Sequence, residues 1–133
     1  YPHCIPTAET HPHEDCFGRP MRSKTERDIA NIYNKYNVPF RYEEETIVNG
    51  HKYYIDFKVC NFQAQKIYPH EHFGMWDDPE YVLRNMKKLS DMAVAEYVPN
   101  SNFIVTYETK KHPLDIYEFE EYVKTKLILP WKV

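Results

Sequence analysis

The strongest constraint on the fold is a tight hairpin near the middle of the chain. Asn49-Gly50 is the dipeptide most typical of a two-residue β-turn, because both residues tolerate the positive φ angles that such a turn requires. It separates two stretches with strand character, residues 40–48 and 52–62. In the second stretch apolar side chains alternate with polar ones, as they do on a sheet. We therefore expect two long antiparallel strands.

The segments on either side of this hairpin predict a first helix and a third strand. Ser23 and Glu26 match a capping box, and the helix that they begin ends at Asn37-Val38-Pro39. The third strand is predicted at residues 66–73. Pro69 lies within it, and because proline lacks an amide to donate, it predicts an edge position or a strand end.

The second half of the chain predicts a helix, a strand and a final helix. The sequence Asp-Asp-Pro-Glu at residues 77–80 begins a helix that extends to about Glu96. A fourth strand is predicted at residues 102–107, and Asp115 with Glu118 caps the last helix. This α-β-β-β-α-β order with a closing helix predicts an α/β fold in which helices flank a mixed central sheet.

Residues 1–21 are rich in Pro and His and show no periodicity, so we expect an irregular lead-in before one domain at residues 22–133. The lead-in contains side chains of the types that bind zinc. They are Cys4, His11, His13 and Cys16. Their spacing matches no familiar zinc finger, so a metal site, a disulfide between the two cysteines and an uncommitted tail all remain open.

Composition excludes several classes of protein. A net charge of -3 lacks the basic signature of a nucleic-acid coat protein and predicts a weak grip on DNA. The 3 glycines do not form the glycine-rich loop of a P-loop ATPase. No apolar segment reaches transmembrane length and no signal peptide is recognisable, so we expect a cytoplasmic protein without a membrane partner. The first residue is Tyr1, as expected for a piece of a longer protein.

Four charged residues are candidates for catalysis. They are Glu26, Asp56, Glu71 and Lys88. Asp56 lies within a predicted strand, where aspartate is disfavoured, and Glu71 lies near the end of the next strand. Carboxylates on adjacent strands can bind Mg²⁺ or Mn²⁺, and a nearby lysine can stabilise the charge that develops on a phosphodiester. For Glu26, helix capping is an alternative explanation.

Five sequence blocks together resemble a known family. They are Ser23-Lys24-Thr25-Glu26, Tyr42-Glu43, Tyr54-Ile55-Asp56-Phe57, Glu71-His72-Phe73-Gly74-Met75, and Asp78-Pro79-Glu80-Tyr81 followed by Lys88. Over residues 22 to about 127 the chain resembles the PD-(D/E)XK nuclease superfamily, in particular the small restriction-endonuclease-like domains attached to bacterial helicases and other DNA-repair-type proteins. The resemblance implies a restriction-endonuclease-like core and Mg²⁺-dependent cleavage of DNA. It also implies Asp56 and Glu71 as metal ligands, with Glu26 as an accessory acid.

The chain departs from the family pattern at two positions. Ile55 replaces the proline of the family name, which is not a metal ligand. Phe73 stands where the family has a lysine, two residues after Glu71. We expect the following helix to supply this charge from Lys88, with Lys87 as the second candidate.

Two alternatives remain open. Asp56-Phe57-Lys58 is itself an Asp-x-Lys sequence, and Glu43 on the preceding strand would then be the paired acid. That assignment of the motif residues gives no role to the sequence block that begins at Glu71. The absent lysine and the negative net charge also favour a nuclease-fold module without activity that binds DNA or docks a protein.

Overall fold

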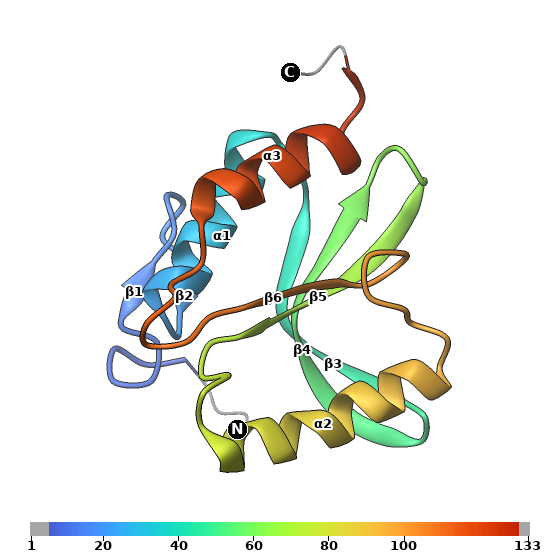
Figure 1. The fold of residues 1–133 in the computed structure, drawn as a ribbon. Coiled ribbons are helices and arrows are strands. Elements are labelled where there is room, and N and C mark those ends of the chain that lie inside the picture. Colours follow the sequence, from blue (N-terminus) through green and yellow to red (C-terminus); the bar gives the residue numbers. More distant parts are fainter. Residues whose placement is uncertain (1–5, 131–133) are drawn as a thin grey trace. The chain divides into compact units, whose positions relative to one another are not determined.

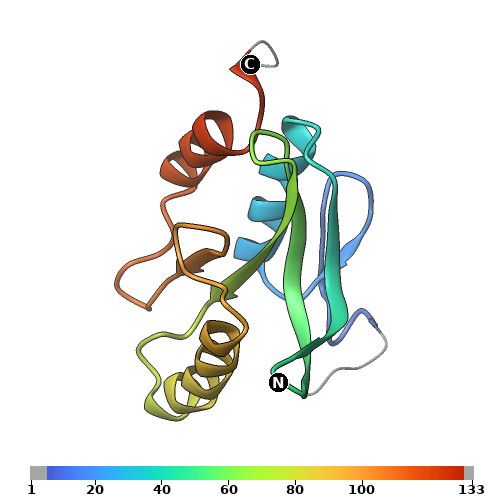
Figure 2. The same ribbon diagram turned by 90° about the vertical axis from the view of Figure 1, so that its right-hand side faces the viewer.

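The hairpin predicted at Asn49-Gly50 is present in the computed structural model, which describes residues 6–130. Strands β3 (Phe40–Val48) and β4 (His51–Asn61) pair antiparallel on either side of it. The two turn residues have φ angles of 49° and 76°, both in the left-handed region that the sequence predicts. Figures 1 and 2 show β3 and β4 as two long neighbouring strands.

The described chain divides into two units, each of which is interrupted in sequence. Unit 1 contains the described residues up to Pro39, Cys60–Lys66 and those from Asp115, and unit 2 contains Phe40–Val59 and Ile67–Leu114. Three helices and a four-stranded mixed sheet are present in the described part, as expected for an α/β fold. No helix within residues 6–130 is both long enough and apolar enough to span a membrane.

The sheet has the strand order β3-β4-β5-β6, where β5 is Lys66–Phe73 and β6 is Ile104–Tyr107. β5 and β6 run parallel, so the chain needs a crossover between them, and helix α2 (Pro79–Val94) provides it. The Asp78 side chain caps α2 by accepting hydrogen bonds from the first free amides of the helix. The sheet is therefore mixed, as the order of elements predicts.

The expected edge position of residues 66–73 is wrong, because β5 lies between β4 and β6. Pro69 is tolerated for a local reason. The carbonyl of Phe73 accepts the amide of Glu108, so this side of β5 faces β6, and Pro69 faces the same side because backbone groups alternate along a strand. Pairing with β6 begins only at His70, so the absent amide of Pro69 has no β6 residue opposite it.

Unit 1 is built around helices α1 (Lys24–Lys35) and α3 (Ile116–Lys126), which lie side by side in Figure 1. The rings of Tyr33 and Phe119 meet edge to face with centroids 5.5 Å apart. The carboxylate of Glu120 accepts hydrogen bonds from Lys35 and from Tyr36, both at 2.6 Å. Contacts between side chains distant in sequence thus join the two helices.

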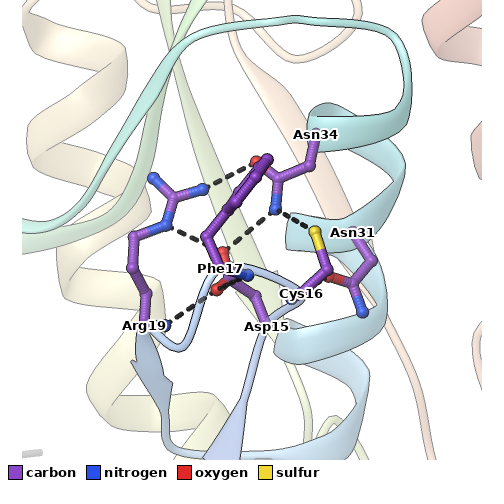
Figure 3. A network of polar contacts seen from close by, with 6 residues as sticks. All are labelled: Asp15, Cys16, Phe17, Arg19, Asn31 and Asn34. Atoms are coloured by element: carbon purple, nitrogen blue, oxygen red, sulfur yellow. Dashed lines mark hydrogen bonds and ion pairs between the residues drawn. The ribbon is translucent and has the colours of Figure 1, made fainter.

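Part of the lead-in is ordered, contrary to the expected irregular segment. Strands β1 (His13–Glu14) and β2 (Pro20–Met21) form a short antiparallel pair, and Met21 is fully buried. Figure 3 shows the loop between them wrapped around the buried Asp15 carboxylate. This carboxylate accepts the amides of Phe17 and Arg19 at 3.0 and 2.8 Å.

Helix α1 holds this loop through a side-chain amide. Asn34 donates to Asp15 at 3.0 Å and accepts from the guanidinium of Arg19 at 2.6 Å, as drawn in Figure 3. Such bonds leave no hydrophobic periodicity in the sequence, which is why residues 1–21 predict an irregular segment.

One hydrophobic cluster of unit 2 joins α2 to the hairpin. Its buried members are Val48, Ile55, Met92 and Phe103, with Tyr53, Leu89, Tyr97 and Val105 packed against them.

We expect Ile55→Ala to lower the free energy of unfolding by about 3 kcal/mol, because Ile55 is only 1% exposed and its loss leaves a cavity. Urea denaturation followed by circular dichroism measures the change.

The matched control is Ile47→Ala on the same hairpin. Ile47 is 64% exposed, so its substitution should change the free energy of unfolding by less than about 0.5 kcal/mol. Equal losses in the two variants would contradict the assignment of the core.

Candidate metal site

Asp56 on β4 and Glu71 on β5 lie side by side and are buried, with exposures of 3% and 2%. Each carboxylate accepts a hydrogen bond from the backbone of the neighbouring strand. The amide of His72 donates to Asp56 Oδ2 at 2.9 Å, and the amide of Asp56 donates to Glu71 Oε1 at 3.4 Å. These reciprocal bonds hold the two predicted ligands at one level of the sheet.

Lys88 reaches this pair from α2. Its Nζ lies 2.7 Å from Glu71 Oε1 and donates to the carbonyl of Tyr54 at 3.2 Å. Only 13% of the Lys88 side chain is exposed, whereas Lys87 is exposed on the same helix. A helix thus brings a lysine to the strand acids, as expected for Lys88.

The alternative lysine, Lys58, lies in a different ion pair. Its Nζ is 3.1 Å from Glu44 Oε1, and this hydrogen bond, ahead of other causes, lowers the pKa of Glu44. Glu43, the paired acid of that alternative, lies between Tyr42, which pairs with Phe57, and Glu44, which pairs with Ile55. Glu43 is 7% exposed and has a φ of 53°, a left-handed conformation that is unusual within a strand. The alternative therefore retains its acid but has its lysine paired with another residue.

The two carboxyl groups and the ammonium group control each other's charge. Burial, and then the neighbouring charge of Asp56, raises the pKa of Glu71 well above its ordinary value, although Lys88 acts in the opposite direction. Burial disfavours the ammonium of Lys88, but attraction to Glu71 and Asp56 outweighs it and raises the pKa of Lys88. Burial and the neighbouring carboxylate therefore favour the protonated form of Glu71, whereas the ammonium of Lys88 favours its ionised form.

Glu26 belongs to unit 1, whereas Asp56, Glu71 and Lys88 belong to unit 2. The amide of Glu26 donates to Ser23 Oγ at 3.1 Å, so Ser23 is confirmed as the N-cap, while capping by the Glu26 carboxylate stays a prediction. The residue is buried, at 5% exposure. The role of Glu26 as an accessory acid stays a prediction.

Unit 2 contains a second polar cluster, which the sequence patterns did not predict. The Thr106 hydroxyl lies 2.8 Å from His70 Nε2 and 2.9 Å from His72 Nδ1, and His72 Nε2 lies 3.1 Å from the carboxylate of Glu108. Because an ionised carboxylate only accepts, His72 Nε2 carries the proton and, in the neutral ring, Nδ1 accepts from Thr106. The alternating histidines around Glu71 were the only sequence signal.

The candidate zinc donors of the lead-in are not brought together as a metal site in the described residues. Cys4 lies outside those residues, so its pairing or ligation stays a prediction. His11 Nδ1 lies 2.8 Å from the Thr10 hydroxyl, and the Cys16 sulfur accepts from Asn34 at 3.4 Å. Within residues 6–130, no three His, Cys, Asp or Glu side chains are grouped so that they could hold a metal ion.

Comparisons with known proteins add no family assignment. No protein-family model, curated protein or solved structure matches the chain. The resemblance to the PD-(D/E)XK superfamily therefore rests on the sequence blocks alone and remains a proposal.

We expect acid to destabilise the protein through His70. Burial, and then the neighbouring His72, lowers the pKa of His70 well below its ordinary value of 6.5. The unfolded chain then binds a proton that the folded chain excludes, so the free energy of unfolding should fall as the pH drops below about 6.5. Urea denaturation between pH 7.5 and 5 measures this slope, which His70→Gln should flatten.

His112→Gln is the control, because His112 is exposed and loses little hydration on folding. It should retain the slope of the parent chain. An unchanged slope in His70→Gln would contradict the role of the buried ring.

Proposed function

We propose that the chain is a metal-dependent DNA nuclease domain that hydrolyses phosphodiester bonds within a larger DNA-processing protein. The observation that supports this function is the buried pair Asp56 and Glu71 with the ammonium of Lys88 2.7 Å from one of its oxygens. Proteins commonly bind Mg²⁺ through one or two carboxylates, while water and substrate phosphate fill the remaining positions. Two adjacent acids are therefore enough to hold one Mg²⁺ ion.

The charge balance of the pair fits a divalent cation. Burial, and then the neighbouring charge of Asp56, raises the pKa of Glu71, and a cation bound between the two carboxylates would favour the ionised form of Glu71. These two residues would hold Mg²⁺ or Mn²⁺. When bound, the metal supplies Lewis-acid stabilisation and lowers the pKa of a coordinated water.

The other groups of the proposed site act on geometry and charge. The His72 amide donates to Asp56 Oδ2 at 2.9 Å and so orients that carboxylate. The ammonium of Lys88 stabilises the negative charge that accumulates on the phosphate oxygens during cleavage. The Tyr54 carbonyl, which accepts from the same ammonium at 3.2 Å, restricts its position.

A second candidate function is a catalytically inactive module that binds DNA or docks another protein. The burial of the cluster favours it, because Asp56 and Glu71 are only 3% and 2% exposed and Lys88 already neutralises them. In that case the ion pair between Lys88 and Glu71 has a structural role, joining α2 to the sheet, and takes no part in catalysis.

Cleavage of supercoiled plasmid by the full chain in Mn²⁺ or Mg²⁺ tests the proposal. We expect Asp56→Asn and Glu71→Gln each to reduce the rate by at least about 100-fold, because each removes a proposed ligand. Lys88→Met should reduce it about 100-fold or more, because it removes a cation that stabilises the transition state.

Lys58→Met is the matched control for Lys88→Met and should retain activity. Loss of cleavage in Lys58→Met alone would contradict the assignment of Lys88. Absence of cleavage by the unmodified chain, with either metal, would favour the inactive module.

Metal binding can be measured without any reaction. We expect Mn²⁺ at 100 times its dissociation constant to stabilise the fold by about 2.7 kcal/mol, which thermal melting detects as a higher Tm. At a fixed Mn²⁺ concentration the stabilisation should grow as the pH rises, because burial raises the pKa of Glu71 and the metal binds its ionised form. Asp56→Asn should abolish it, and an equal rise in Tm for that variant would place the metal elsewhere.

A further inference from the structure

The proposed site depends on a lysine with a long, flexible side chain that comes from a helix. A lysine loses considerable rotamer freedom when it is held in one position, so its placement needs support from its surroundings. Lys88 Nζ makes two polar contacts, with Glu71 and with the Tyr54 carbonyl. Both lie on the sheet, so the position of the ammonium depends on how α2 is held against the strands.

Asp91 lies one turn after Lys88 on α2 and joins this helix to the sheet. Residues three apart lie on the same side of a helix, and Asp91 is only 6% exposed. Its carboxylate accepts from Asn49 Nδ2 at 3.0 Å and from the Tyr53 hydroxyl, and His51 Nδ1 lies 3.1 Å away. All three partners come from the end of the β3–β4 hairpin, so one buried carboxylate joins the helix to that end of the sheet.

Tyr53 contacts both parts of this arrangement. Its hydroxyl binds Asp91, while its ring centroid lies 5.7 Å from Lys88 Nζ, within the range of a cation–π contact. The next residue, Tyr54, supplies the carbonyl that accepts from Lys88. Two consecutive residues of β4 thus set the helix and the ammonium relative to the sheet.

The pKa shifts of Tyr53 and Asp91 agree with the hydrogen bond between them. Hydrogen bonds from Tyr53 and then Asn49 hold the pKa of Asp91 below its ordinary value. Burial, and then the bond to Asp91, raises the pKa of Tyr53 to about 12. At neutral pH the hydroxyl therefore remains a donor and the carboxylate an acceptor.

We propose that Tyr53 and Asp91 are positioning residues that hold the ammonium of Lys88 against Glu71. The catalytic meaning of this inference rests on the proposed nuclease function, but the positioning itself does not. The Tyr53–Asp91 bond holds α2 in register with β4, and the Tyr53 ring limits the rotamers of Lys88.

The test uses nuclear magnetic resonance of the lysine ammonium groups in the full ¹⁵N-labelled chain, with Lys88→Met to assign the Lys88 signal. In the parent chain the Lys88 ammonium is buried and held by two polar contacts. It should therefore exchange its protons slowly and give an observable signal. We expect Tyr53→Phe, which keeps the ring but removes the hydroxyl, and Asp91→Asn to broaden that signal beyond detection. Melting curves establish that each variant is folded at the temperature used.

Two controls separate positioning from a general loss of stability. Tyr54→Phe makes the same substitution at the adjacent residue, whose hydroxyl bonds to Glu45, and should keep the signal. Val48→Ala weakens the same core without removing the Tyr53–Asp91 bond and should also keep it. If Asp91→Asn does not fold, Tyr53→Phe decides alone.

The outcomes separate this inference from the proposed function. A signal retained in Tyr53→Phe overturns the positioning role, whatever the cleavage assay shows. A signal lost in Tyr53→Phe but kept in both controls supports it, even if the parent chain proves inactive and the nuclease proposal fails. If the parent chain cleaves DNA, Tyr53→Phe should lower kcat about tenfold and change KM less than about twofold, because a displaced ammonium affects the transition state more than substrate binding.

Discussion

The contact between Lys88 and Glu71 is the interaction on which the site in unit 2 depends. A second carboxyl group, that of Asp56, lies beside Glu71, and both acids are buried. Two buried acids without a cation would be costly, because the interior stabilises charge poorly. The ammonium from α2 at 2.7 Å offsets this cost and ties the crossover helix to the sheet. The same charge that supports the proposed chemistry therefore also supports the fold.

Strand β5 connects two polar clusters, because successive side chains of a strand point to opposite faces. Glu71 faces Lys88, while His70 and His72 face the Thr106 hydroxyl. The backbone amide of His72 also donates to Asp56. One residue thus takes part in both clusters, so a change to its ring interactions can alter the orientation of a proposed metal ligand. This arrangement explains why β5 carries so many polar groups in a buried, central position.

Much of the architecture could be predicted from short-range signals. The Asn49-Gly50 turn requires positive φ angles, and both residues adopt them. The side chains of Ser23, Asp78 and Asp115 each accept an amide at the start of the predicted helix. These signals act between residues a few positions apart, so they can be recognised from the sequence without knowledge of the tertiary structure. The adjacency of Asp56 and Glu71 followed from the expectation that their strands are neighbours.

Several features involve partners far apart in the sequence, and the sequence patterns did not predict them. Tyr53 and Asp91 are separated by 38 residues, and His70 and Thr106 by 36. The loop around Asp15 is held by Asn34, which hydrophobic periodicity does not reveal. Pro69 predicted an edge strand or a strand end, yet β5 is central and contains Pro69 within it. The proline is tolerated because pairing with β6 begins only at His70.

The sequence by itself determined the helix starts, the hairpin and the set of charged residues available for a site. Only the tertiary structure decided that Lys88, and not Lys58, lies beside Glu71, while Lys58 pairs with Glu44. The physical reason is that turns and caps are local equilibria of the backbone. The choice of an ion-pair partner instead depends on where α2 packs against the sheet, and that packing is the sum of many contacts between distant residues.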